Sequence, residues 1–146
     1  IVNLNDLIVE VLKLLRFELQ RKSIEFITEF GEVPVLTVDP NKIKQVVINL
    51  VMNAAHAMQG QGKITVTTGI NATGILELQV RDTGPGIAPE LQEEVFAPFF
   101  TTKPEGEGTG LGLYICQNII REHGGTIALE SQLGEGTLFR ISFPVE

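Results

Sequence analysis

The order of helical and strand-like segments is the feature that most constrains the fold of this chain. Apolar residues recur at helical spacing in three segments, at residues 3–22, 40–58 and 110–122. Strand-like segments lie at residues 24–30, 35–38, 63–70, 75–82, 126–131 and 137–143. Short turns join the third to the fourth of these strands and the fifth to the sixth. Helices alternate with strands, and some of the strands form hairpins. This order favours an α/β fold with a mixed sheet and helices on one face of it. A doubly wound parallel sheet is less favoured.

The composition argues against several classes of function. With 43% apolar residues, the 146-residue chain is expected to form one domain, 1–146, with a real core. A net charge of −7 argues against nucleic acid or an anionic membrane surface as a partner. The single cysteine, Cys116, excludes an internal disulfide, and two distant histidines, His56 and His123, argue against a histidine metal site. No apolar stretch reaches the roughly 18 residues that span a bilayer. We therefore expect a cytoplasmic chain, and its start at Ile1 suggests a fragment of a longer protein.

Two glycine-rich loops predict a nucleotide site. Residues 82–86 read Asp-Thr-Gly-Pro-Gly, and residues 108–112 read Gly-Thr-Gly-Leu-Gly directly before a predicted helix. Glycines let the backbone approach a ligand with free N–H groups, and a helix N-terminus favours phosphate. The second loop does not complete the dinucleotide fingerprint, because Leu113 stands where the third glycine is needed. The chain also lacks the P-loop string and the protein-kinase motifs.

Asn49 and Asn53 stand one turn apart at the edge of the apolar stripe of the helix 40–58. An amide oxygen is a suitable Mg²⁺ ligand, and Mg²⁺ takes few protein ligands besides water and substrate phosphates. The alternative is that both amides cap neighbouring backbone groups, as buried amides commonly do.

Asp82 falls on the apolar face of its strand, where a carboxylate is costly unless it binds something. Thr137 begins the last strand on the face that also carries Phe139. Together the two polar groups could hold the amino edge of adenine, directly or through water. The alternative for Asp82 is a turn-forming role in the loop that follows. Between these motifs, residues 98–109 form an irregular segment that we expect to be a lid, poorly ordered without nucleotide, with Lys103 either on a phosphate or in solvent.

Taken in order, these motifs resemble a known family. They are residues 49–54 (N box), 82–86 (first glycine box), 96–100 (F box), 108–112 (second glycine box) and 134–137 (Gly-x-Gly-Thr). From Leu4 to Pro144 the chain resembles the catalytic ATP-binding domain of sensor histidine kinases, within the superfamily of gyrase-type ATPases, heat-shock chaperones and mismatch-repair ATPases. It is most similar to the nitrogen-regulation and sporulation type.

The resemblance implies the Bergerat fold, a two-layer α/β sandwich with a mixed five-stranded sheet, about three helices on one face and a mobile ATP lid. It implies ATP and Mg²⁺ as cofactors, with Asn53 as the metal ligand, Asn49 beside the phosphates and Asp82 on the adenine amino group, supported by Thr137. With Lys103, Asn49 and Asn53 form the implied catalytic set. The other implied nucleotide contacts are His56, Ala57, Gly84, Gly86, Ile87, Thr102, Gly108, Thr109, Gly110, Leu111 and Gly112.

Asn49 decides the expected chemistry, because hydrolysing relatives carry a glutamate base at the matching position. An amide cannot accept a proton from water, so phosphoryl transfer is favoured over hydrolysis. His56 replaces a lysine that many family members carry, which weakens cationic help near neutral pH. Neither His56 nor His123 lies in a phosphoacceptor motif. The resemblance thus implies transfer to a histidine on a separate dimerisation domain, a downstream response regulator, a monomeric isolated domain and a homodimeric parent. An ATPase-driven clamp and a degenerate nucleotide-binding module remain the alternatives.

Overall fold

The computed structural model describes residues 1–20, 23–59, 61–98 and 112–144. The elements in chain order are α1 (Leu4–Gln20), β1 (Ser23–Phe30), α2 (Pro40–Ala57), β2 (Gln61–Ile70), β3 (Leu76–Asp82), α3 (Pro89–Gln92), α4 (Gly112–Glu122), β4 (Thr126–Gln132) and β5 (Gly136–Phe143).

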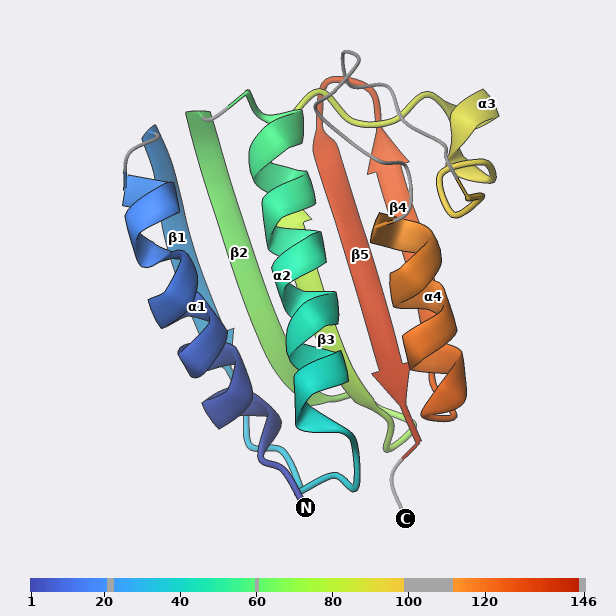
Figure 1. The fold of residues 1–146 in the computed structure, drawn as a ribbon. Coiled ribbons are helices and arrows are strands. Elements are labelled where there is room, and N and C mark those ends of the chain that lie inside the picture. The colour runs from blue at the N-terminus through green and yellow to red at the C-terminus, as the bar shows by residue number, and fades with distance from the viewer. Residues whose placement is uncertain (21–22, 60, 99–111, 145–146) are drawn as a thin grey trace.

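The five strands form one mixed sheet in the order β1-β2-β3-β5-β4. β1 and β2 are parallel, with α2 as the crossover between them, and every other neighbouring pair is antiparallel. The long helices α1, α2 and α4 lie across one face of the sheet, with α2 between the other two (Figure 1). This arrangement confirms the predicted two-layer α/β sandwich with a mixed five-stranded sheet and three helices on one face.

The core lies between these two layers. The predicted apolar stripe of α2 is buried against the sheet, and its members are Ile43, Val46, Val47, Leu50, Val51 and Ala54. Alternate residues of β2, β3 and β5 face it, including Ile64, Val66, Leu76, Leu78, Val80, Phe139, Ile141 and Phe143. The predicted start of α2 is also confirmed, because Asp39 Oδ1 accepts the Asn41 N–H at 3.0 Å and Pro40 opens the helix.

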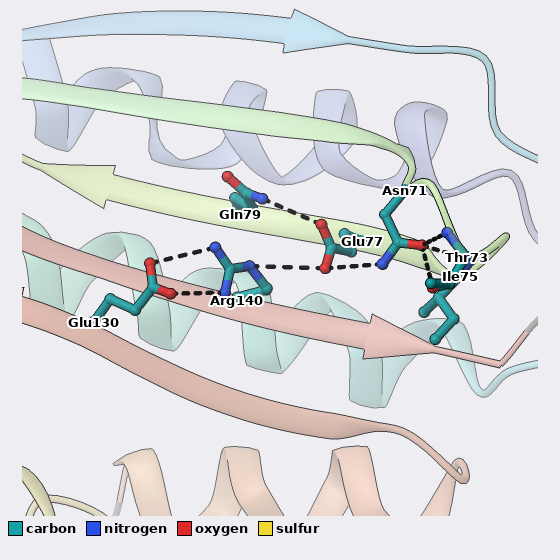
Figure 2. Close-up of polar contacts among 7 residues, drawn as sticks. All are labelled: Asn71, Thr73, Ile75, Glu77, Gln79, Glu130 and Arg140. Carbon is teal, nitrogen blue, oxygen red and sulfur yellow. Dashed lines mark hydrogen bonds and ion pairs between the residues drawn. The ribbon is translucent and has the colours of Figure 1, made fainter.

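The opposite face of the sheet carries a polar network instead of helices (Figure 2). Arg140 Nη1 donates to Glu130 Oε1 at 2.9 Å, and Arg140 Nε lies 3.7 Å from Glu77 Oε2. Asn71 and Gln79 each donate to the Glu77 carboxylate at 3.3 Å. The hydrogen bond with Glu130 raises the pKa of Arg140. These charged and polar side chains satisfy one another on the face of the sheet that the long helices do not cover.

One predicted strand is wrong. Residues 35–38 contribute only a single bridge, in which the backbones of Leu36 and Val2 exchange two hydrogen bonds of 2.7 Å. Pro34 has no N–H to extend the pairing on one side. Leu36 is buried and Val35 is 59% exposed, so the segment keeps the alternation that suggested a strand, but it pairs through one bridge only. Among the described helices, none combines the length and the apolar character that crossing a membrane requires.

Candidate nucleotide site

The predicted site residues of the described part gather where β3 and β5 meet the C-terminal half of α2. Asp82 ends β3, and its register partner across the sheet is Thr137, near the start of β5. Gly84 lies against the end of α2, since a Cβ atom there would be 3.2 Å from Met58 Cγ. α4 bounds the other side, because Asn49 of α2 contacts Cys116 of α4. The structure therefore brings the two predicted motifs on α2 and β3 into one region.

Asp82 is only 4% exposed, and its two carboxylate oxygens differ in their partners. Oδ1 accepts the Gly84 N–H at 2.9 Å and the Thr137 N–H at 3.2 Å. No hydrogen bond with a described residue uses Oδ2. Burial raises the pKa of Asp82, and the two N–H donors oppose that shift by stabilising the ionised form. The turn-forming alternative thus accounts for one oxygen of Asp82, while the other stays available to a donor.

Thr137 is also buried, and its hydroxyl contacts Ser131 of β4. The two oxygens, Thr137 Oγ1 and Ser131 Oγ, are 3.1 Å apart. Ser131 Oγ also accepts the Ile87 N–H at 2.8 Å and donates to the Gly136 carbonyl at 2.9 Å. Ser131 was not among the predicted site residues. No signal in the sequence alone identifies Ser131, because its position opposite Thr137 depends on the register of β4 against β5.

Two glycines of the predicted boxes hold conformations that a side chain would disturb. Gly86 has φ +79°, and a Cβ atom there would overlap the carbonyl oxygen of Gln132. Gly136 has φ +96°, and a Cβ atom would overlap the carbonyl oxygen of Asp82. These close approaches bring the loop after β3 and the hairpin between β4 and β5 into direct contact beside the Asp82 carboxylate.

The two asparagines of α2 have different surroundings, although both are half-buried. Asn49 Nδ2 donates to Cys116 Sγ at 3.7 Å. Burial raises the pKa of the Cys116 thiol to about 11, so the thiol stays protonated at neutral pH. Asn53 makes no hydrogen bond with any described residue. Neither amide caps a backbone group within the described ranges, which weakens the capping alternative. An unpaired amide oxygen on Asn53 fits a magnesium ligand.

The structure describes some of the remaining predicted site residues and not others. His56 and Ala57 are exposed at the end of α2, and Gly112 is the first residue of α4. Ile87 lies beside the hairpin through its N–H bond to Ser131. Phe96 packs edge to face on Phe139, with ring centroids 6.2 Å apart. The predicted contacts that lie outside the described residues are Thr102, Lys103, Gly108, Thr109, Gly110 and Leu111.

Comparison with known proteins identifies the family of this chain. Residues 38–146 match the family described as histidine kinase-, DNA gyrase B-, and HSP90-like ATPase. The sensor histidine kinase ZraS of Salmonella typhi is 43% identical over 145 residues, which are 99% of this chain and 31% of that protein. The chain therefore spans less than a third of the length of that curated relative.

Solved structures with the same fold include the nucleotide-free catalytic domain of histidine kinase ThkA, with a TM-score of 0.86 at 41% identity over 98% of this chain and 93% of that one. ThkA in complex with the response regulator protein TrrA matches with a TM-score of 0.82 at 38% identity, over 98% of this chain and 40% of that one. Full-length ShkA in complex with AMPPNP matches with a TM-score of 0.86 at 28% identity, over 98% of this chain and 30% of that one.

The two-layer sandwich, the buried Asp82 carboxylate and the two half-buried asparagines of α2, together with the match over residues 38–146, define the class of protein. The chain belongs to the family of histidine kinase-, DNA gyrase B- and HSP90-like ATPases. Within that family, its similarity to ZraS and to the ThkA catalytic domain identifies it as the ATP-binding domain of a sensor histidine kinase.

Proposed function

We propose that this chain, as a single catalytic domain, binds ATP with Mg²⁺ and donates the γ-phosphoryl group to a histidine on a separate dimerisation domain. The observation that carries the proposal is the Asp82 carboxylate, which is buried and fixed through Oδ1 while Oδ2 has no partner among the described residues. The Oδ2 atom can therefore accept a hydrogen bond from a ligand donor in place of water. The exocyclic amino group of adenine is such a donor.

The base and the phosphates would then occupy the two ends of one site. Asp82 and Thr137 would face the base, and Gly84 and Gly86 would shape the backbone around it. Asn49 and Asn53, on the α4 side of α2, would face the phosphates. The N-terminus of α4 at Gly112 would add free N–H groups and the positive end of the helix dipole.

The two α2 side chains proposed for the phosphate end are amides, and neither is a base for hydrolysis. Asn49 can donate or accept a hydrogen bond, but it cannot take a proton from water at neutral pH. Asn53 would hold the magnesium ion through its amide oxygen, and Lys103 would lie on a phosphate. When bound, the magnesium ion neutralises negative charge on the phosphates. Asn49 and Asn53 would then orient the triphosphate, and an external nucleophile would complete the transfer.

The partners follow from the same proposal. The accepting histidine would lie on a dimerisation domain of the parent protein, which we propose to be a homodimer. A response regulator would receive the phosphoryl group next, and the ThkA complex with a response regulator supports this partner class. The location we propose for this domain is the cytoplasm, whatever the membrane anchoring of the parent.

Calorimetry with ATP and with AMPPNP, each in the presence and absence of Mg²⁺, tests the binding step. Phosphorylation of a separately supplied dimerisation domain by γ-labelled ATP tests the transfer. We expect magnesium-dependent binding, very slow release of inorganic phosphate, and label on the acceptor histidine. Rapid hydrolysis without transfer would instead support the ATPase-driven clamp. Absence of nucleotide binding would support the degenerate module.

A further inference from the structure

The hydroxyl groups of Thr137 and Ser131 belong to one chain of hydrogen bonds. Counting the donors and acceptors in this chain determines which hydroxyl donates to which partner. Its neighbour Ser131 Oγ has three partners: the Ile87 N–H, the Gly136 carbonyl oxygen and Thr137 Oγ1, at 2.8, 2.9 and 3.1 Å. A serine hydroxyl has one hydrogen to donate and two lone pairs to accept with.

Each partner permits one assignment. The Ile87 N–H can only donate, so Ser131 accepts from it. The Gly136 carbonyl can only accept, so it takes the single hydrogen of Ser131. The remaining lone pair of Ser131 must then accept from Thr137, which uses the only hydrogen of Thr137. In this arrangement Ser131 is fully satisfied, and Thr137 Oγ1 retains acceptor capacity alone.

Thr137 lies directly across the sheet from Asp82 on the same face, and the ionised carboxylate of Asp82 is also an acceptor. The proposed base site therefore presents acceptors at both positions. A purine with an amino group on C6 offers hydrogens to them, whereas a purine with an oxo group at C6 presents another acceptor. An unpaired acceptor that faces another acceptor in a buried site is unfavourable.

We propose that Ser131 is a specificity-determining residue that fixes Thr137 as an acceptor and so makes the pocket prefer 6-amino over 6-oxo purine nucleotides. The proposal rests on the proposed function, since it requires the base to lie against Asp82 and Thr137. Ser131 acts through Thr137 and is thus a positioning residue without contact to the nucleotide.

ATP and ITP are the matched probes, because they differ at C6 and in the hydrogen on the adjoining ring nitrogen. In Ser131→Ala the Thr137 hydroxyl loses its acceptor and can turn its hydrogen to the oxo group of ITP. We expect the ratio of ATP to ITP affinity, measured by calorimetry, to fall about three- to tenfold, which corresponds to one neutral hydrogen bond. Ser131→Thr keeps a hydroxyl at the same strand position and should restore the wild-type ratio.

Gln92→Ala provides the structural control. Gln92 Nε2 donates to the carbonyl oxygens of Ile87 at 2.9 Å and of Ser131 at 3.0 Å. Its removal loosens the same loop and leaves the hydroxyl chain intact, so the affinity ratio should not change. In a Thr137→Val background, Ser131→Ala should likewise have no further effect on the ratio.

Two outcomes distinguish a failure of the role of Ser131 from a failure of the proposed function. If Ser131→Ala leaves the ratio unchanged, or Gln92→Ala shifts it equally, the role of Ser131 is refuted and the nucleotide site stands. If the unmodified chain binds ATP no more tightly than ITP, the base does not lie against Asp82, and the proposed function fails with the inference.

Discussion

Replacement of Asp82 by asparagine should have opposite effects on nucleotide affinity and on the stability of the nucleotide-free chain. The amide oxygen of asparagine can still accept the Gly84 and Thr137 N–H groups that Oδ1 accepts at 2.9 and 3.2 Å. The group in place of Oδ2 becomes an NH₂ donor, which would face the amino group of adenine. Loss of a hydrogen bond to a charged acceptor corresponds to about 1.5–3 kcal/mol, or a roughly ten- to hundredfold loss of ATP affinity.

The effect on stability follows from the direction of the pKa shift. Because burial raises the pKa of Asp82 in the folded chain, the folded state holds its proton more tightly than the unfolded state. The stability of the unmodified chain therefore falls as the pH rises from the unfolded-state pKa of about 4 through the raised folded value, and stays lower above it. Asp82→Asn removes this loss, so the nucleotide-free variant should melt at the same or a higher temperature at pH 7–8.

Thermal unfolding between about pH 4 and 8, paired with calorimetry for ATP, tests both effects. The stability difference between the variant and the unmodified chain should shrink as the pH falls. Glu135→Gln is the matched control, since it removes one negative charge at an exposed position. A variant that loses stability and ATP affinity together would show that Asp82 has a folding role, and the adenine assignment would lose its physical basis.

Three further substitutions test other parts of the site. Asn53→Ala should abolish the magnesium dependence of ATP binding. It should change the unfolding free energy by less than about 0.5 kcal/mol, because Asn53 makes no hydrogen bond with a described residue. An unchanged magnesium titration would refute the metal role of Asn53. Cys116→Val removes the sulfur acceptor of Asn49 Nδ2, so ATP affinity measured by calorimetry should drop a few-fold both with Mg²⁺ and in EDTA, while Cys116→Ser should retain it. Gly86→Ala should lower the unfolding free energy by about 1–3 kcal/mol in thermal melts, since its φ of +79° and the nearby Gln132 carbonyl leave no room for a methyl group; a neutral result would mean that the loop has an alternative path.

The layered fold could be predicted from periodicity because each long element faces the core on one side only. The stripe of α2 and the alternation on β3 are both visible in the sequence, and burial confirms them. The failure at residues 35–38 has a local cause, since apolar residues alone do not form a strand without a neighbouring strand to pair with. Leu36 shows the difference, because it is buried like a strand residue and yet pairs only with Val2.

The site was predictable where a residue breaks its local pattern. Asp82 stands out because it continues an apolar face, and the structure places it beside Thr137. Ser131 breaks no pattern, because a serine in the outer strand of a hairpin is ordinary. Its contact with Thr137 depends on the register of β4 against β5, which periodicity leaves undetermined. The contact between Asn49 and Cys116 depends on the packing of two helices that are far apart in the chain. The sequence of either helix alone therefore does not predict this contact.

The burial of Cys116 gives this chain a built-in reporter of its own opening. Only the thiolate reacts with alkylating reagents, and a fully buried thiol with a pKa of about 11 offers almost none. Modification must therefore wait until α4 separates from α2, and its rate measures how often that separation occurs. Since no other cysteine is present, the label needs no engineering and reports on the one helix pair that encloses Asn49.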